Sequence, residues 1–344
     1  MNMIKQQLFG AGRIIGMSVL ALWLTSCRSA ETESNITGGT ASVKINLQGS
    51  TYENDSEVKP TASADHKNTS VLSETTQVQE IPFSDRYSLL ATFTKESVTQ
   101  AASFQASSGK NNLMAATESK SQQLADNIMY KIVVYDASGR YVTDRNFVRG
   151  KEDNTSVTPS LNLNGGQNYT FIAYSVNSAT GVPDISTSSR LSGAFLLVMD
   201  IEDFMYFRKD TSVSGDGTNY LNVVLKHKTS QVTLTMDSSL TGNSISDISA
   251  YFSPHYPNTG ILLSNGSLQY PPGTQVNKNI SFSGLGTNII SGGISKLSAD
   301  TTTAELTIAT MTIGGVTQTN LKIPNIKIIP GLRYNLNIQV KPRL

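Results

Sequence analysis

The chain has 344 residues, and its 27 lysine and arginine residues nearly balance its 26 aspartate and glutamate residues. Only 15% of the residues are charged, which excludes a protein that binds nucleic acid through a basic face. The single cysteine excludes a disulfide within one chain, so we expect stability to come from packing and from hydrogen bonds between strands. The length allows two domains.

Residues 1–26 have the pattern of a secretory signal peptide. Lys5 and Arg13 precede a mostly apolar run, residues 14–24, which is too short to cross about 30 Å of hydrocarbon. The run ends in LTSC, which resembles the bacterial lipobox, in which the cysteine is diacylated and becomes the mature N-terminus. We therefore predict lipid attachment at Cys27. The alternatives are an uncleaved membrane anchor and a plain signal peptide with an incidental cysteine.

Residues 27–86 are predicted to contain a tether, one strand and a linker. From Ala41 to Gly49 apolar and polar residues alternate, as is typical of a half-buried strand. Residues 53–80 are rich in Ser, Thr, Asp and Glu without any period, so we expect a flexible linker there.

The pattern of the rest of the chain predicts short strands separated by turns. A strand is expected at Tyr87–Thr94, a hairpin at residues 128–147 and a second hairpin at residues 161–176. Residues 191–210 break the pattern and are expected to hold a short helix or an irregular crossing. Further strands are expected at Tyr220–Lys226, Gln231–Met236, Ile261–Leu263, Ser267–Tyr270, Ala304–Ile313, Val316–Ile323 and Arg333–Val340.

This succession predicts an all-β protein with two tandem antiparallel β-sandwich domains. The boundary is placed in the Gly- and Ser-rich stretch VSGDGTN, residues 213–219. The N-terminal sandwich would then be residues 87–212 and the C-terminal sandwich residues 213–344.

The sequence offers little for catalysis or for a metal site. It contains no HExxH or GxSxG motif, and its only cysteine is assigned to lipid. The acidic residues of the stretch 200–203 are expected to lie in a solvated loop. We predict no enzyme activity, no cofactor and no metal, and packing or hydrogen-bonding roles for two of the histidines, with the third in the linker. The histidines are His66 in the linker, His227 and His255.

The strand pattern is similar to that of a known family. The segments that carry it are YKIVVYDASGRYV, LNLNGGQNYTFIAYSVN, DFMYFRKD, NYLNVVLKHKTSQVTLTMD and IIPGLRYNLNIQVK. Together with the lipobox they resemble the fimbrillin-like lipoproteins of Bacteroidetes, over most of the chain. The resemblance implies two transthyretin-like β-sandwich domains, a lipid (palmitate) anchor in the outer membrane and an adhesive role in fimbriae of the type V pilus class, with other fimbrial subunits as partners.

The resemblance also implies that the N-terminal strand is removed by proteolysis after a basic residue and replaced by a strand from a neighbouring subunit. The removable strand would be Ala41–Gly49, and the donated strand would be Arg333–Val340. No arginine lies between Arg28 and Arg86, so Arg86 is the first candidate for cleavage and Lys67 the second. The alternative is that both are ordinary solvated charges.

Two other functions stay open. Sugars are commonly bound by stacked aromatic rings, and Tyr251, Tyr256 and Tyr270 are candidate glycan contacts beside a group of prolines, although such residues also pack locally. The chain would then be a monomeric surface lipoprotein that binds host or bacterial glycans. A third alternative, behind glycan binding, is a non-repeating anchor or tip subunit of a fibre.

Overall fold

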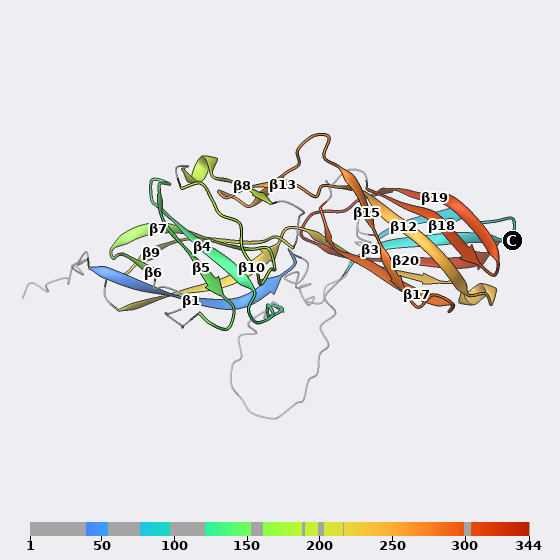
Figure 1. Ribbon diagram of the computed structural model, residues 1–344, viewed down its shortest axis with the longest axis horizontal. Coiled ribbons are helices and arrows are strands. Elements are labelled where there is room, and N and C mark those ends of the chain that lie inside the picture. The colour runs from blue at the N-terminus through green and yellow to red at the C-terminus, as the bar shows by residue number, and fades with distance from the viewer. Residues whose placement is uncertain are drawn as a thin grey trace, which may run out of the picture. The chain divides into compact units, whose positions relative to one another are not determined.

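The computed structural model describes eight stretches of the chain, and nearly all regular structure in them is β-strand (Figure 1). In these stretches the complete helical elements are two 3-10 turns, Leu191–Gly193 (η2) and Ser239–Thr241 (η3), and Glu53 is also in 3-10 conformation. Among the described residues no helix is long and apolar enough to span a membrane. The prediction of an all-β protein is confirmed. The described stretches are residues 39–53, 76–96, 121–152, 161–187, 190–198, 203–215, 217–298 and 304–343.

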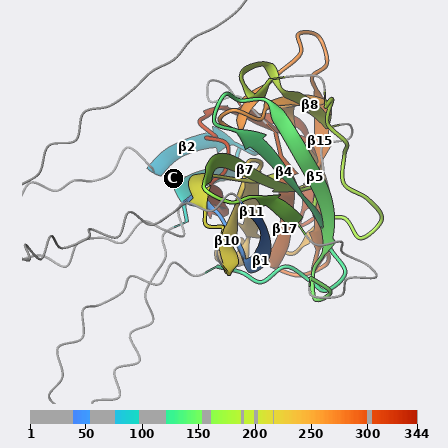
Figure 2. The same cartoon turned by 90° about the vertical axis from the view of Figure 1, so that its left-hand side faces the viewer.

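The first sandwich is built on a seven-stranded sheet with the order β5-β4-β7-β9-β10-β1-β6. Figure 2 shows β5, β4 and β7 side by side in it. Because successive residues of a strand point to opposite faces, Val133 and Ile172 pack against the small sheet β14-β13-β8, while Val134 and Phe171 point into a core shared by all seven strands. The strands are β1 (Thr40–Thr51), β4 (Met129–Asp136), β5 (Tyr141–Val148), β6 (Leu161–Asn164), β7 (Gln167–Ser175), β8 (Phe195–Val198), β9 (Met205–Val213), β10 (Thr218–His227), β13 (Thr259–Leu262) and β14 (Ser267–Gln269).

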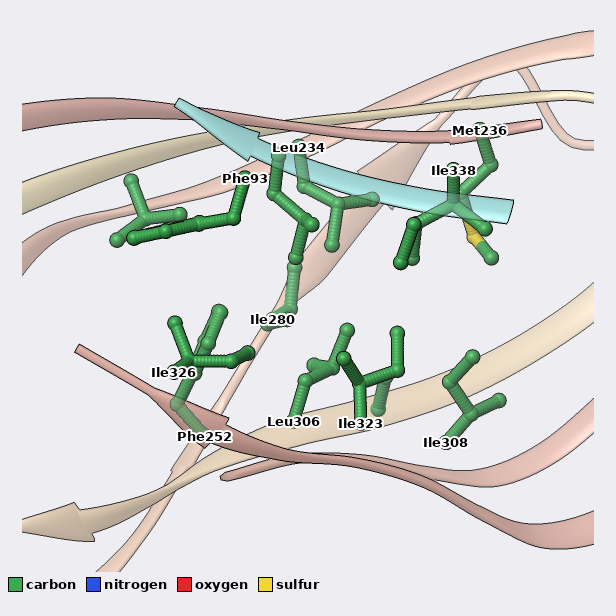
Figure 3. Close-up of a cluster of buried hydrophobic side chains, with 14 of the residues drawn as sticks. Phe93, Leu234, Met236, Phe252, Ile280, Leu306, Ile308, Ile323, Ile326 and Ile338 are labelled. Atoms are coloured by element: carbon green, nitrogen blue, oxygen red, sulfur yellow. The ribbon is translucent and has the colours of Figure 1, made fainter. Parts of the chain in front are cut away.

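The second sandwich packs a six-stranded sheet, β16-β17-β11-β20-β3-β2, against a four-stranded sheet, β15-β12-β18-β19. Figure 3 shows Leu234 and Ile338 of the first sheet facing Leu306 and Ile323 of the second, and all four side chains are fully buried. The strands are β2 (Thr76–Pro82), β3 (Tyr87–Lys95), β11 (Ser230–Asp237), β12 (Ile245–His255), β15 (Val276–Asn279), β16 (Ser281–Ser283), β17 (Ile289–Leu297), β18 (Ala304–Ile313), β19 (Val316–Ile326) and β20 (Arg333–Pro342).

Of the two predicted hairpins, one is confirmed and one is wrong. β4 and β5 pair across the turn at Asp136, where the Gly139 N–H donates to the Asp136 carbonyl at 2.9 Å and Gly139 has a φ of 73°. β6 and β7 are also joined by a short turn, but they do not pair. β6 pairs with β1, and β7 lies between β4 and β9.

Each of the two large sheets contains one parallel pair, which the expectation of antiparallel sandwiches did not include. β1 runs parallel to β10, and β11 runs parallel to β20. Parallel neighbours cannot be joined by a tight hairpin. Both pairs therefore bring together strands that are far apart in the sequence.

The strand pairing divides the chain differently from the expected boundaries at 86/87 and 212/213. β3 does not open the first sandwich, because it pairs with β2 and β20 in the second. β10, β13 and β14 follow residue 213 but belong to sheets of the first sandwich. The stretch 213–219 leads from β9 to β10 inside one sheet. Alternation of apolar residues predicts which face of a strand is buried, but it does not predict which other strand pairs with it.

Candidate functional site

The strand predicted to be removable, Ala41–Gly49, is the centre of β1. β1 lies between β10, which is parallel to it, and β6, which is antiparallel to it (Figure 1). The side chains of Ala41, Val43 and Leu47 are buried in the core of the seven-stranded sheet. If β1 left, β10 and β6 would expose unpaired backbone groups beside an apolar slot, which is the template that strand addition requires.

The pairing of β1 with β10 shifts by one residue at a β-bulge between Leu47 and Gly49. Gly49 has a φ of 120°, and a methyl group on it would lie 2.6 Å from the carbonyl oxygen of Gln122. Beyond the bulge, the backbone of Ser50 exchanges two hydrogen bonds of 2.8 Å with that of Gln122. The end of β1 is therefore held by a segment outside the main sheet, at a position that accepts only glycine.

Arg86 does not lie at the end of a linker as predicted, but in the turn of the β2–β3 hairpin. Its side chain is exposed, and its carbonyl oxygen accepts a 2.8 Å hydrogen bond from the Arg343 N–H. A cut after Arg86 would separate both β1 and β2 from the rest of the chain. The second candidate, Lys67, and the lipidation candidate, Cys27, lie outside the described residues.

The C-terminal strand, β20, has the predicted alternation of buried apolar residues with polar ones. Tyr334, Leu336, Ile338 and Val340 are all buried. β20 pairs with β11 on one side and with β3 on the other, so both of its edges are already used within the chain. To be donated as predicted, β20 would have to leave this position, and its release would open the core of the second sandwich.

Two of the three candidate glycan residues come together. The rings of Tyr256 and Tyr270 lie 4.7 Å apart, and Tyr270 lines a cavity of about 230 Å³ together with Glu53, Lys228 and Ser267. Burial lowers the pKa of the Lys228 ammonium, which lies 5.6 Å from the ring centroid of Tyr206. Tyr251 is not part of this group, because it pairs with residues of β15 and β18.

The two described histidines are buried, and both have hydrogen-bonding roles, as predicted. Nδ1 of His255 accepts a hydrogen bond of 3.2 Å from the Ser298 N–H, and burial lowers its pKa to about 4. Nδ1 of His227 lies 2.6 Å from Oδ1 of Asp203. His66 lies outside the described residues, and no group of three or more His, Cys, Asp or Glu side chains among the described residues is placed to hold a metal ion.

Two residues that the structure places next to His227 were not selected from the sequence. Asp203 was expected in a solvated loop, but it is only 6% exposed. Ser50 was one of many serines in the chain, and its hydroxyl lies 3.1 Å from Nε2 of His227. The only sequence signal was the glycine that precedes Ser50 at the end of an alternating strand.

Comparison with known proteins finds structural similarity only. No protein-family model and no curated protein matches the chain. Solved structures that resemble it include a candidate cell adhesion protein from Bacteroides uniformis, with 14% identity over 64% of this chain and 91% of that one and a TM-score of 0.41. A candidate cell adhesion protein from Bacteroides fragilis has 14% identity over 68% of this chain and 88% of that one, with a TM-score of 0.39. A candidate polysaccharide-binding protein from Bacteroides thetaiotaomicron has 16% identity over 54% of this chain and 69% of that one, with a TM-score of 0.38.

Proposed function

We propose that this chain is an exported, lipid-anchored cell-surface protein that serves as a structural and adhesive subunit of fimbria-like fibres, and that the subunits join by strand exchange at β1. The observation that carries this proposal is the position of β1. It is the first described strand, it follows a lipobox-like sequence, and it is inserted between two strands that would both become open edges without it.

Proteolysis supplies the release step in this proposal. A cut at Lys67 detaches β1 alone, whereas a cut at Arg86 also detaches β2, which pairs only with β3 at the edge of its sheet. The strand that refills the slot comes from a neighbouring subunit, and it must place apolar side chains where Ala41, Val43 and Leu47 now lie.

Intact mass and N-terminal sequencing of the protein from cell-surface fractions of its host test this function. A start at Tyr87 or Asn68, together with a ladder in unboiled gel samples, is the expected result. A diacylated start at Cys27 with β1 retained and no ladder contradicts a repeating subunit, and fits an anchor or a monomeric lipoprotein.

Limited digestion of the folded protein with trypsin tests the cleavage sites separately. We expect cuts at Arg86 or Lys67, after which the body of the protein remains intact. Cuts spread over residues 130–340 contradict the assignment, because paired and buried strands resist proteases.

A second candidate function is glycan binding at the Tyr256–Tyr270 pair. It is favoured by one observation, the cavity beside Tyr270 that also presents a carboxylate, an ammonium group and a hydroxyl. A glycan array tests it, with Tyr270→Ala as the binding-site variant and Tyr251→Ala as the matched control. Binding at background level removes this function.

A further inference from the structure

Three side chains at the end of β1 form a chain of hydrogen bonds. Nε2 of His227 lies 3.1 Å from Oγ of Ser50, and Nδ1 of His227 lies 2.6 Å from Oδ1 of Asp203. Ser50 is 5% exposed, and His227 and Asp203 are each 6% exposed. A serine, a histidine and a carboxylate in this order are the arrangement that activates a serine hydroxyl as a nucleophile.

The surroundings orient the histidine for this chemistry. An ionised carboxylate only accepts hydrogen bonds, so beside an ionised Asp203 the imidazole carries a proton on Nδ1, and in its neutral form it accepts at Nε2 from the Ser50 hydroxyl. The same hydroxyl also lies 3.4 Å from the Gln122 carbonyl oxygen. Asp203 is itself held by the hydroxyl of Thr229 at 3.3 Å and by the amide of Asn177 at 3.4 Å. The ring of Tyr52 stacks on the His227 imidazole, with the ring centroids 4.0 Å apart and an angle of 4° between the ring planes.

The peptide bond that precedes this serine joins Gly49 to Ser50. A serine hydroxyl reaches the carbonyl carbon of the preceding residue through a five-membered ring, so no separate substrate has to be bound. Gly49 has no side chain to hinder the attack. Its φ is 120°, and it lies directly after the register shift in the pairing of β1 with β10. The N–H of the Gly49–Ser50 peptide donates to the Gln122 carbonyl at 2.8 Å.

We propose that Ser50 cleaves the Gly49–Ser50 peptide bond within its own chain. His227 Nε2 takes the hydroxyl proton as Oγ attacks the carbonyl carbon of Gly49. The C–N bond then breaks, its nitrogen receives the proton from His227, and an ester joins Gly49 to Oγ of Ser50. Water hydrolyses the ester to give a carboxylate on Gly49 and a free amine and hydroxyl on Ser50. The net reaction consumes one water and needs no cofactor.

The cut falls where the fold retains both products. After it, residues 40–49 are held by pairing with β10 and β6 and by their buried side chains, and no longer by a covalent bond. The fragment that carries the lipobox then separates from residues 50–344 when this strand is pulled out. This reaction needs no external protease. A protease specific for arginine would find no site between Arg28 and Arg86, because no arginine lies there. Its use in strand exchange rests on the function proposed above, but the cleavage itself does not.

The test is denaturing mass spectrometry of the purified full-length chain during incubation at neutral pH, with and without hydroxylamine. We expect two fragments, one ending at Gly49 and one starting at Ser50. Hydroxylamine attacks the ester, so it should accelerate the cleavage and leave a hydroxamate on Gly49. Ser50→Ala should abolish the cleavage, and His227→Asn should slow it by at least about 100-fold.

Two further variants separate chemistry from folding. Ser50→Cys retains a nucleophile, so it should still cleave and should be sensitive to hydroxylamine. Ser121→Ala is the matched control, because its hydroxyl bonds to β1 at the Gln48 carbonyl, 3.0 Å away, and has no part in the histidine cluster. It should cleave at the wild-type rate. Circular dichroism of each variant reports whether it has folded.

The opposite results overturn the proposal. A chain that remains intact with hydroxylamine means that the cluster only holds β1 against β10, and equal cleavage of wild type and Ser50→Ala means that another group does the chemistry. The fibre function fails separately. A chain that cuts at Ser50 but forms no ladder supports self-cleavage and contradicts the fibre. Ladders built by Ser50→Ala subunits cut at Arg86 support the fibre and overturn the use of self-cleavage as its release step.

Discussion

The first and last strands of the described chain each belong to a parallel pair, but their neighbours hold them differently. β1 pairs with β10 from Ser42 to Thr51, and with β6 only from Thr40 to Val43. β20 pairs with β3 from Tyr334 to Pro342 and with β11 along most of the same length. Releasing β20 therefore breaks two long ladders, whereas releasing β1 breaks one long and one short. β1 is therefore held by fewer backbone pairs than β20, which favours β1 over β20 as the strand released in the proposed exchange.

The largest expected effect compares the same substitution in the two strands. Leu336 of β20 is fully buried, and Leu47 of β1 is 9% exposed. We expect Leu336→Ala to lower the free energy of unfolding by about 4 kcal/mol, and Leu47→Ala by about 2 kcal/mol, because the second site is nearer the solvent and the cavity there can relax. Urea unfolding of both variants measures the difference. Equal losses would mean that β1 is as firmly held as β20.

The sequence could predict which residues of these strands are buried. Val43 and Leu47 alternate with polar residues, as do Leu336 and Ile338, and all four are buried in the structure. The sequence could not predict which strands are neighbours. The alternating pattern of β3 fits either sandwich equally well, and its place beside β20 depends on long-range pairing that leaves no local signal.

The candidate site was predictable to a similar extent. His227 was expected to form hydrogen bonds, and it does. Its partners were not predictable, because Asp203 and Ser50 are 24 and 177 residues away in the sequence and no motif surrounds them. Only the folding of β1 alongside β10 brings the serine to the histidine.

The next effect concerns the bulge that distinguishes β1 from β20. Gly49→Ala places a methyl group against the Gln122 carbonyl at a positive φ, so we expect a loss of about 2–3 kcal/mol. Gly181→Ala is the matched control, because it has no atom within 4 Å of the added carbon and no positive φ. It should be neutral, or stabilising by less than about 1 kcal/mol. If both variants unfold at the same urea concentration, the end of β1 is not constrained by the bulge.

A smaller effect depends on pH and lies in the second sandwich. Burial, together with the nearby Lys278 ammonium, lowers the pKa of His255 from its usual 6.5 to about 4. Between pH 6.5 and pH 4 the unfolded chain therefore binds a proton that the folded chain does not, and the free energy of unfolding falls as the pH falls. We expect His255 to account for roughly 2 kcal/mol of this loss, with screening by solvent allowed for.

Thermal unfolding across this pH range, with wild type and His255→Asn compared, measures the contribution of His255. The variant should lose less stability than wild type between pH 6.5 and pH 4. Parallel pH profiles for the two proteins would show that His255 is not the group responsible. The loss of stability in acid would then come from other titratable groups.

The smallest effect tests what holds β1 on its exposed face. The Asn46 side-chain amide donates to the Asn222 side-chain oxygen at 2.9 Å, across the β1–β10 pair and in contact with solvent. Water replaces such a bond readily, so Asn46→Ala and Asn222→Ala should each cost about 0.5–1 kcal/mol, with a coupling of about 0.5 kcal/mol in a double-mutant cycle. A small coupling means that burial of Val43 and Leu47 and the backbone ladder hold β1, all of which an incoming strand with the same pattern can reproduce. A coupling above about 2 kcal/mol would make this asparagine pair specific to β1, and a substitute strand would then need asparagine at the same position.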